Sequence, residues 1–293
     1  MEKISFDFDS IDLATVIEEK VIEHPEATEP EAIPTEAKED TQKPLFRQSS
    51  VQHYFKCPRK YKLYLTYKDF VEDRMAMRKG RIFETHVFGH KPGDDVEDYQ
   101  KSTIGKITAP TIKQIALQAE KAKKIFTVGD PFVKLKVEMD KFTAQGELDF
   151  LGRGYFEGEE IEAIWDLKYT ANIDEFWNKK QRKEEFLQGI WYPWMLFQTT
   201  GKLLPFIYVI VESTYDDPLI KMIRVDVKEN DFLWLIHQLN TVANDYFFEA
   251  NVGEGCMGYR GFGKCSMLEW CAEGREYIEQ TIDIRFEDLL NAE

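Results

Sequence analysis

The sequence lacks any apolar run close to the roughly 20 residues that a membrane-spanning helix needs. Its first residues are acidic, unlike those of a secretory signal. We therefore expect a soluble, cytoplasmic protein with no membrane partner. Hydrophobic residues make up 43% and aromatic residues 14% of the chain, so a packed core is expected and global disorder is excluded.

The chain also lacks a positive balance of charge. Its net charge of −15 argues by itself against a nucleic-acid partner. The distribution is uneven, however: residues 1–44 contain thirteen acidic and four basic residues, whereas residues 45–82 contain ten basic and three acidic ones. A domain that is acidic overall can still present a basic track to phosphates. Charge therefore permits a DNA partner without demonstrating one.

Cysteine is scarce. The four cysteines are Cys57, Cys256, Cys265 and Cys271. Because nothing indicates secretion, disulfides are not expected. The cysteines are either ligands of one metal centre or four unlinked, partly buried residues.

Residues 1–44 have the composition of a disordered acidic tail. Within it, residues 4–8 mix apolar and acidic side chains. This mixture is typical of either a docking motif for a protein partner or a solvated terminus. The remainder, 45–293, is expected to fold as one domain. Apolar spacing predicts helices at 49–68, 75–90, 111–126, 174–198 and 229–250. Alternation predicts strands at 132–140, 142–152, 160–169, 204–214 and 219–227, of which the first three form a meander. The predicted class is α/β, a mixed central sheet flanked by helices.

Two predicted strands end in charged residues. Asp149 closes the segment Gly146–Asp149, and Asp166 and Lys168 close the next strand on one face of it. Two carboxylates from adjacent strands suit Mg²⁺ or Mn²⁺, and a lysine beside them can stabilise a reacting phosphate and orient water. An ordinary ion pair is the alternative, but charge at the end of an apolar strand is costly.

Three further residues can join this group. Gln188 and Tyr192 are spaced i, i+4 on a predicted helix, so they share a face from which they can hydrogen-bond phosphate. His86 follows Gly80 on another predicted helix, and a neutral imidazole is a plausible metal ligand. A separate site made of His86 and His90 is disfavoured because no third ligand is evident. The segment 258–264 imitates a phosphate-binding loop, but Cys265 stands where that loop needs Ser or Thr, so an ATPase is rejected.

The order of His86, Gly-x-x-Asp, Asp-x-Lys and Gln-x-x-x-Tyr resembles the RecB-like branch of the PD-(D/E)XK nucleases. That branch includes RecB and AddB nuclease domains, CRISPR adaptation nucleases and phage exonucleases. The resemblance runs from about residue 49 to residue 271, and residues 49–61, SSVQHYFKCPRKY, look like the family's opening motif. It implies a restriction-endonuclease-like fold, with the catalytic sheet and helix in 126–227.

The resemblance also implies the site. One or two Mg²⁺ or Mn²⁺ ions would be held by His86, Asp149, Asp166 and the carbonyl of Leu167. The catalytic residues would be Asp149, Asp166, Lys168, Gln188 and Tyr192. Glu147 shares the strand face of Asp149, but the family's key acid matches Asp149. Glu147 is therefore expected next to the metal ligands and not among them.

In the iron–sulfur members of the family, one early cysteine and three C-terminal ones hold a [4Fe–4S] cluster that staples the chain ends together. Cys57 and the pair Cys265 and Cys271 match this pattern. The resemblance thus implies a metal-cluster staple made of residue 57 and a C-terminal cysteine-cluster region at 256–271. Cys256 departs from the pattern, because eight residues separate it from Cys265 where two are usual. Structural Zn²⁺ is the competing occupant.

The expected function is a metal-dependent deoxyribonuclease, an exonuclease on single-stranded or end-containing DNA in recombination, repair or phage DNA processing. A structure-specific endonuclease with the same site is one alternative. A non-catalytic DNA-binding or recruitment protein with a four-cysteine metal centre is another. Four residues near the opening cysteine can either grip a single strand or pack in the core: Tyr54, Arg59, Lys60 and Tyr61.

Overall fold

The computed structural model describes residues 43–67, 75–91, 107–177, 186–253, 256 and 265–279. The predicted tail, except for its last two residues, lies outside this part of the chain. So do residues 178–185 of a predicted helix and the loop-like segment 258–264. Within the described ranges, no helix has the length and apolarity that crossing a membrane requires.

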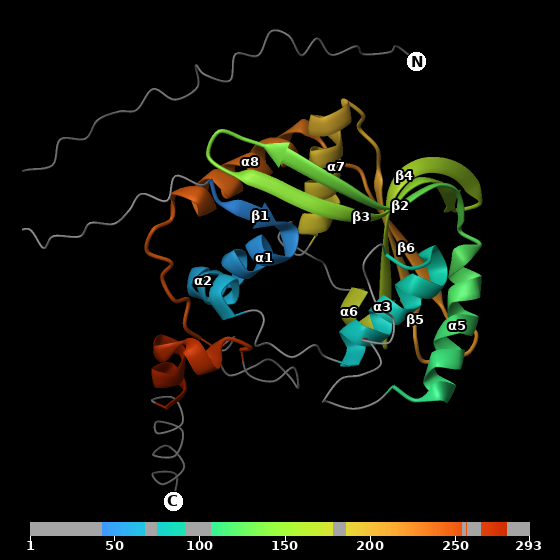
Figure 1. Ribbon diagram of the computed structural model, residues 1–293, viewed down its shortest axis with the longest axis horizontal. Helices are drawn as coiled ribbons and strands as arrows, with labels where there is room; N and C mark the ends of the chain where they lie inside the picture. The colour runs from blue at the N-terminus through green and yellow to red at the C-terminus, as the bar shows by residue number, and fades with distance from the viewer. Residues whose placement is uncertain are drawn as a thin grey trace, which may run out of the picture. The chain divides into compact units, whose positions relative to one another are not determined.

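Six strands form one mixed sheet (Figure 1). They are β1 (Leu45–Arg47), β2 (Phe126–Glu138), β3 (Thr143–Phe156), β4 (Glu159–Thr170), β5 (Phe206–Glu212) and β6 (Ile220–Val225). The predicted meander is confirmed, because β2, β3 and β4 pair antiparallel in succession. β1 pairs parallel with β3 and β5 parallel with β4, while β6 closes the far edge antiparallel to β5.

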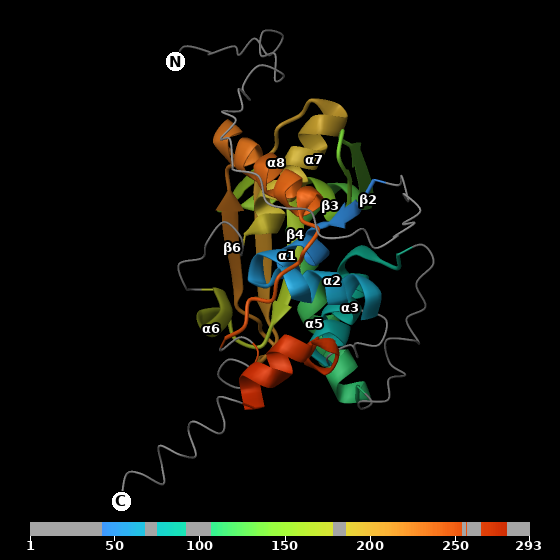
Figure 2. The same ribbon diagram turned by 90° about the vertical axis from the view of Figure 1, so that its left-hand side faces the viewer.

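Helices cover both faces of the sheet, and Figure 2 shows α7 and α8 lying apart from α3 and α5. One apolar core packs α1 (Gln48–Lys56), α7 (Leu187–Thr200) and α8 (Glu229–Asn244) against the sheet. A second core packs α3 (Met75–Phe88) and α5 (Ala109–Lys123) against it. Shorter elements complete the order: α2 (Pro58–Tyr67), α6 (Ile173–Trp177) and a 3-10 turn at Leu268–Trp270. The predicted α/β class, a mixed central sheet flanked by helices, is confirmed.

The predicted helix 49–68 is two helices, because the chain breaks at Cys57. This residue is extended, with φ −166° and ψ 115°. A residue that precedes proline is driven out of the helical region, and Pro58 then begins α2, where its missing N–H costs nothing. The break turns Cys57 out of both helices.

Two strands, β1 and β4, pair with different parts of the same edge of β3, and Asp149 lies in the gap between them. β2 occupies the other edge along almost the whole strand. On the shared edge, β1 pairs with residues 143–145 and β4 with residues 150–156. Residues 146–149 pair with neither strand there, so β4 separates from β3 at Asp149.

Candidate active site

Asp149 sits where the β3–β4 ladder stops. The ladder ends with the pair Phe150 and Trp165, so Asp149 falls opposite Asp166 in the same register. Beyond that point the backbone N–H of Leu167 donates to Oδ2 of Asp149 at 2.8 Å. The carboxylate therefore replaces a backbone acceptor at the point of divergence. It also ties the two acid-bearing strands together.

Asp166 and Lys168 form a close pair on β4. Nζ of Lys168 lies 2.5 Å from Oδ2 of Asp166, whose side chain is 3% exposed. Burial raises the pKa of Asp166 to about 7, and the charge of Asp149 adds to the effect while Lys168 opposes it. Burial works to lower the pKa of Lys168, but the neighbouring carboxylates outweigh it and the net shift is upward. Lys168 is thus held as a cation against a carboxylate that is costly to ionise.

Glu84 of α3 is a third carboxylate at this place, and the sequence did not single it out. Burial, followed by the charge of Asp149, raises its pKa to about 7. Nζ of Lys91 lies 3.5 Å from Glu84 and 2.8 Å from Glu147, so this lysine bridges two acids at the margin of the site. The structure therefore gathers Glu84, Asp149 and Asp166 around Lys168.

His86, the predicted metal ligand, is not brought to these carboxylates. Its side chain is exposed, and two residues along a helix turn a side chain by roughly 200°. Because Glu84 faces Asp149, His86 points almost the opposite way. Glu84, and not His86, is the α3 residue that lies near Asp149 and Lys168.

The carboxylates fit a divalent cation in their chemistry. Among the described residues, no three His, Cys, Asp or Glu side chains are gathered closely enough to hold an ion as they stand. Oδ2 of Asp166 is buried, and its contact among the described residues is the ion pair with Nζ of Lys168. The raised pKa values of Asp166 and Glu84 show that nearby charge and burial work against ionisation. A hard cation relieves both costs, since it stabilises the ionised carboxylates and offsets the repulsion between them.

Gln188 and Tyr192 line the same groove as Asp149, as their helical spacing predicts. Gln188 is a hydrogen-bond partner of the Tyr192 hydroxyl, and burial, with the charges of Asp166 and Asp149, raises the pKa of Tyr192. The ring stacks on Phe206 at 6.1 Å between centroids. It also lies against Gly146 of β3, where an added Cβ would come within 2.6 Å of Cε1. Gly146 is therefore required for Tyr192 to reach the site.

Gly146→Ala is expected to lower the free energy of unfolding by about 1–3 kcal/mol, because the new methyl group overpacks a filled contact. It should also lower activity, because the Tyr192 ring must shift. Thermal unfolding and a nuclease assay measure the two effects. Gly80→Ala is the control: nothing lies within 4 Å of its Cβ, so helix propensity should stabilise that variant by up to about 1 kcal/mol. Equal melting temperatures for the parent and Gly146→Ala would contradict the prediction.

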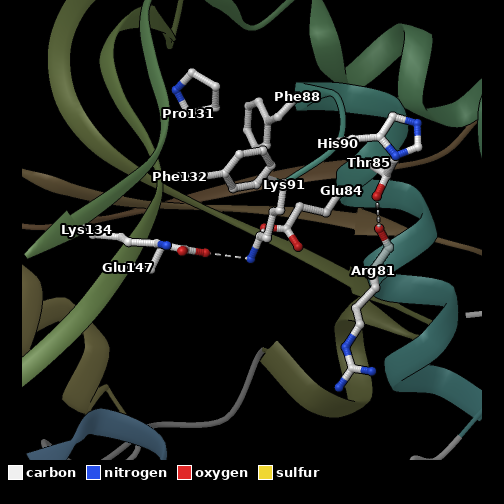
Figure 3. A pocket seen from close by; sticks show the side chains of 10 residues that line it. All are labelled: Arg81, Glu84, Thr85, Phe88, His90, Lys91, Pro131, Phe132, Lys134 and Glu147. Carbon is white, nitrogen blue, oxygen red and sulfur yellow. Dashed lines mark hydrogen bonds and ion pairs between the residues drawn. The ribbon is translucent and has the colours of Figure 1, made fainter. Parts of the chain in front are cut away.

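Glu84 and Asp149 line an open groove with a basic rim. One part, of about 690 Å³, is lined by Asp149, Gln188 and Tyr192 together with Arg47 and Lys136. The adjoining part, of about 840 Å³, is lined by Glu84 and Arg81, among others (Figure 3). Three residues line both parts: Lys91, Lys134 and Glu147. An acidic centre between cations is suited to a metal ion and a phosphodiester strand that crosses it.

All four cysteines line one cavity of about 280 Å³. They are free of disulfides. The backbone N–H of Asn251 donates to Sγ of Cys57 at 3.3 Å. An added Cβ on Gly274 would lie 3.3 Å from Sγ of Cys271 and 3.6 Å from Sγ of Cys256. The long spacing between Cys256 and Cys265 thus does not keep the four residues apart.

The residues around the opening cysteine have structural contacts. Tyr61 is buried in the core that contains α7, and Tyr54 packs against that core. The Tyr54 hydroxyl donates to Oδ2 of Asp245 at 2.7 Å. Arg59 forms an ion pair with Glu273 at 2.7 Å, and Lys60 lines the cysteine cavity. Of the two predicted roles, core packing fits Tyr54 and Tyr61.

No protein-family model matches the sequence, and no curated protein matches it. Among solved structures, the chain is similar to a candidate exonuclease from Eubacterium rectale at 18% identity and a TM-score of 0.46, over 84% of this chain and 94% of that one. A second structure, whose name states no activity, matches at 13% identity and a TM-score of 0.35, over 70% of this chain and 79% of that one. Likenesses this low establish neither a family nor an activity.

Proposed function

We propose that this protein is a divalent-metal-dependent deoxyribonuclease that acts on single-stranded or end-containing DNA. The observation that carries the proposal is the gathering of Glu84, Asp149 and Asp166 around Lys168, beside a groove with a basic rim that Glu84 and Asp149 line. Paired acids with an adjacent lysine match the requirements of phosphodiester hydrolysis. An ordinary surface ion pair has no need of three clustered carboxylates, two of which, Glu84 and Asp166, have raised pKa values.

The metal ion would be held by Asp149, Asp166 and Glu84, with the carbonyl of Leu167 as a further proposed ligand. When bound, the ion lowers the pKa of water and offsets charge on the phosphate. Lys168 keeps its proton because of the carboxylates beside it, so it can orient the attacking water and stabilise negative charge on a phosphate oxygen.

The rest of the groove positions the strand. The Tyr192 hydroxyl keeps its proton because of burial and neighbouring acids, so it can donate to a phosphate oxygen, and Gln188 fixes its orientation. The cations of Arg47, Lys134 and Lys136 line the groove and can pair with phosphates on either side of the reacting one.

The four cysteines are proposed to hold a [4Fe–4S] cluster, with Zn²⁺ as the alternative. Their shared cavity and the close approach of Gly274 to two of the sulfurs support a bound group. Such a group would join the segment at Cys57 to the segment at Cys271 and would have a structural role away from the carboxylates.

The proposal is tested by incubating anaerobically purified protein with end-labelled single-stranded DNA in Mg²⁺, in Mn²⁺ and in EDTA. We expect cleavage in either metal and none in EDTA. Closed circular single-stranded DNA should resist cleavage, because an exonuclease needs an end. Cutting of the circle would replace the exonuclease by an endonuclease with the same site. No cleavage of either substrate would reject the nuclease in favour of a DNA-binding protein.

A matched pair of variants on α3 tests which side chain serves the metal. Glu84→Gln is expected to lower kcat by roughly 10²-fold or more, because it removes a charged ligand beside Asp149. His86→Gln, two residues away and exposed, should keep activity within about threefold of the parent, since a surface change rarely has a larger effect. A larger loss for His86→Gln than for Glu84→Gln would return the histidine to the site.

A further inference from the structure

Phe132 is an aromatic residue in an unusual backbone conformation. It lies in β2 with φ at +57°, a region that bulky side chains rarely occupy and that is found most often at functional sites. Its side chain belongs to neither apolar core, nor is it among the residues packed against them. The strain therefore does not serve the packing of the two cores.

The strained backbone holds Phe132 beside the catalytic acids. In the β2–β3 register, Pro131 pairs with Phe150 and Val133 with Leu148, so Phe132 falls opposite Asp149. Phe132 is thus one residue position away from the proposed metal site.

The ring forms one wall of the 840 Å³ part of the groove (Figure 3). It meets Phe88 edge to face, at 6.1 Å between centroids and an interplanar angle of 90°. Phe88 is itself fixed in place by stacking on Phe150. Nζ of Lys91 lies 4.9 Å from the centroid of Phe132. Two perpendicular rings make a corner that accepts a flat aromatic group against one ring and its edge against the other.

We infer that this corner binds an unpaired nucleobase of the substrate strand, next to the phosphate that is cleaved. The inference rests on the proposed function, since it names the strand's contact beside that site. Bases stack on aromatic side chains without regard to sequence, and nearby cations hold the backbone. Arg81, His90 and Lys134 line the same part of the groove and lie where the phosphates of such a nucleotide would run. A paired base is not available for this stacking, so the corner selects single-stranded DNA.

The test measures binding of the full-length protein, in EDTA, to a labelled oligothymidine of about 12 nucleotides. Phe132→Gly is the main variant, because glycine adopts a positive φ freely. We expect its Kd to rise by about 5- to 100-fold, while its melting temperature equals or exceeds that of the parent. Phe132→Trp should bind within about threefold of the parent, because it keeps a stacking surface. Tyr155→Ala, an exposed aromatic outside the groove, should leave Kd unchanged.

A strand of abasic nucleotides distinguishes stacking from backbone contact. It should bind the parent and Phe132→Gly equally, because no base remains to stack. Three results for Phe132→Gly would overturn the inference. They are an equal loss of affinity for oligothymidine and for the abasic strand, an unchanged Kd for oligothymidine, or a lower melting temperature without a change in Kd. Failure of the nuclease proposal is separate: base-dependent binding through Phe132 without any cleavage would reject only the enzyme. Cleavage with the same KM in the parent and Phe132→Gly would reject only the base site.

Discussion

Asp166→Asn is expected to abolish DNA cleavage and yet to melt at a higher temperature than the parent at pH 8 in EDTA. The loss of activity, roughly 10³-fold or more, follows from removing a proposed metal ligand and the partner of Lys168. The gain in stability follows from burial, because Asp166 is 3% exposed and crowded by Asp149. The amide removes a charge that the folded protein accommodates poorly without a metal.

The direction of the pH dependence follows from the raised pKa. Asp166 titrates near 7 in the folded protein and near 3.9 when unfolded, so the folded state binds more protons between these values. The free energy of unfolding of the metal-free parent therefore falls as pH rises from about 4 through about 7. Glu84, also raised to about 7, acts in the same direction. At pH 5 the free energies of unfolding of the parent and Asp166→Asn should differ little. At pH 8 that of the variant should be higher by about 1–3 kcal/mol.

Thermal melts at pH 5 and pH 8, with EDTA or Mg²⁺, check this prediction. A difference of 1–3 kcal/mol corresponds to roughly 2–12 °C for a chain of this size. Added Mg²⁺ should raise the melting temperature of the parent and leave Asp166→Asn almost unchanged, because the ion binds only where its ligands remain. A variant that melts below the parent at pH 8 in EDTA would show that the Asp166–Lys168 pair is net stabilising.

If the cysteines hold the proposed cluster or Zn²⁺, Cys57→Ser is expected to lose it and to lower the melting temperature by roughly 10 °C or more, because metal binding to such centres contributes directly to folding. The cysteine leaves α1 at the break before Pro58 and faces the C-terminal cysteines across the cavity. Burial raises the pKa of the Cys271 thiol, so this thiol stays protonated at neutral pH until a metal displaces the proton. Without metal, the segment 265–279 should become sensitive to proteases.

Metal analysis and visible absorption of anaerobically purified protein measure the outcome. About four iron atoms per chain and a brown colour that reductant bleaches would identify the cluster. One zinc and no colour would identify the alternative. Ser266→Ala, next to Cys265 but without a thiol, is the matched control and should retain the metal. Four thiols that react freely with an alkylating agent in the purified protein, with no metal present, would contradict a centre of either kind.

Most of the sheet was predictable because its strands alternate or are apolar throughout. The segment 160–169 illustrates this: an apolar run that ends in Asp166 and Lys168 indicated both a strand and a reason for the charges. The pairing of Asp149 with Leu167 was not predictable in detail, because it depends on where β4 leaves β3. The helix break at Cys57 was predictable in principle from Pro58 and was missed.

Glu84 and Phe132 were not identified from the sequence, for different reasons. Glu84 and His86 both flank the apolar stripe of α3, and only the packing of that helix against β4 decides which of them reaches the strand ends. The sequence signal for Glu84 as a site residue was its place four residues after Gly80, and this spacing alone is weak evidence. Phe132 looked like an ordinary strand aromatic, because its positive φ leaves no trace in residue type.

The meeting of Cys57 with Cys271 has a consequence for how the chain is made. Contacts between residues about 190 to 215 positions apart close large loops and are therefore expected to form late. Tyr54 with Asp245 and Arg59 with Glu273 are contacts of the same kind. During synthesis the central sheet can assemble before the C-terminal residues that contact α1 and α2, such as Asp245 and Glu273, have left the ribosome. The helices α1 and α2 are thus expected to be among the last to reach their final positions, and a metal held by the four cysteines would bind at the end of folding.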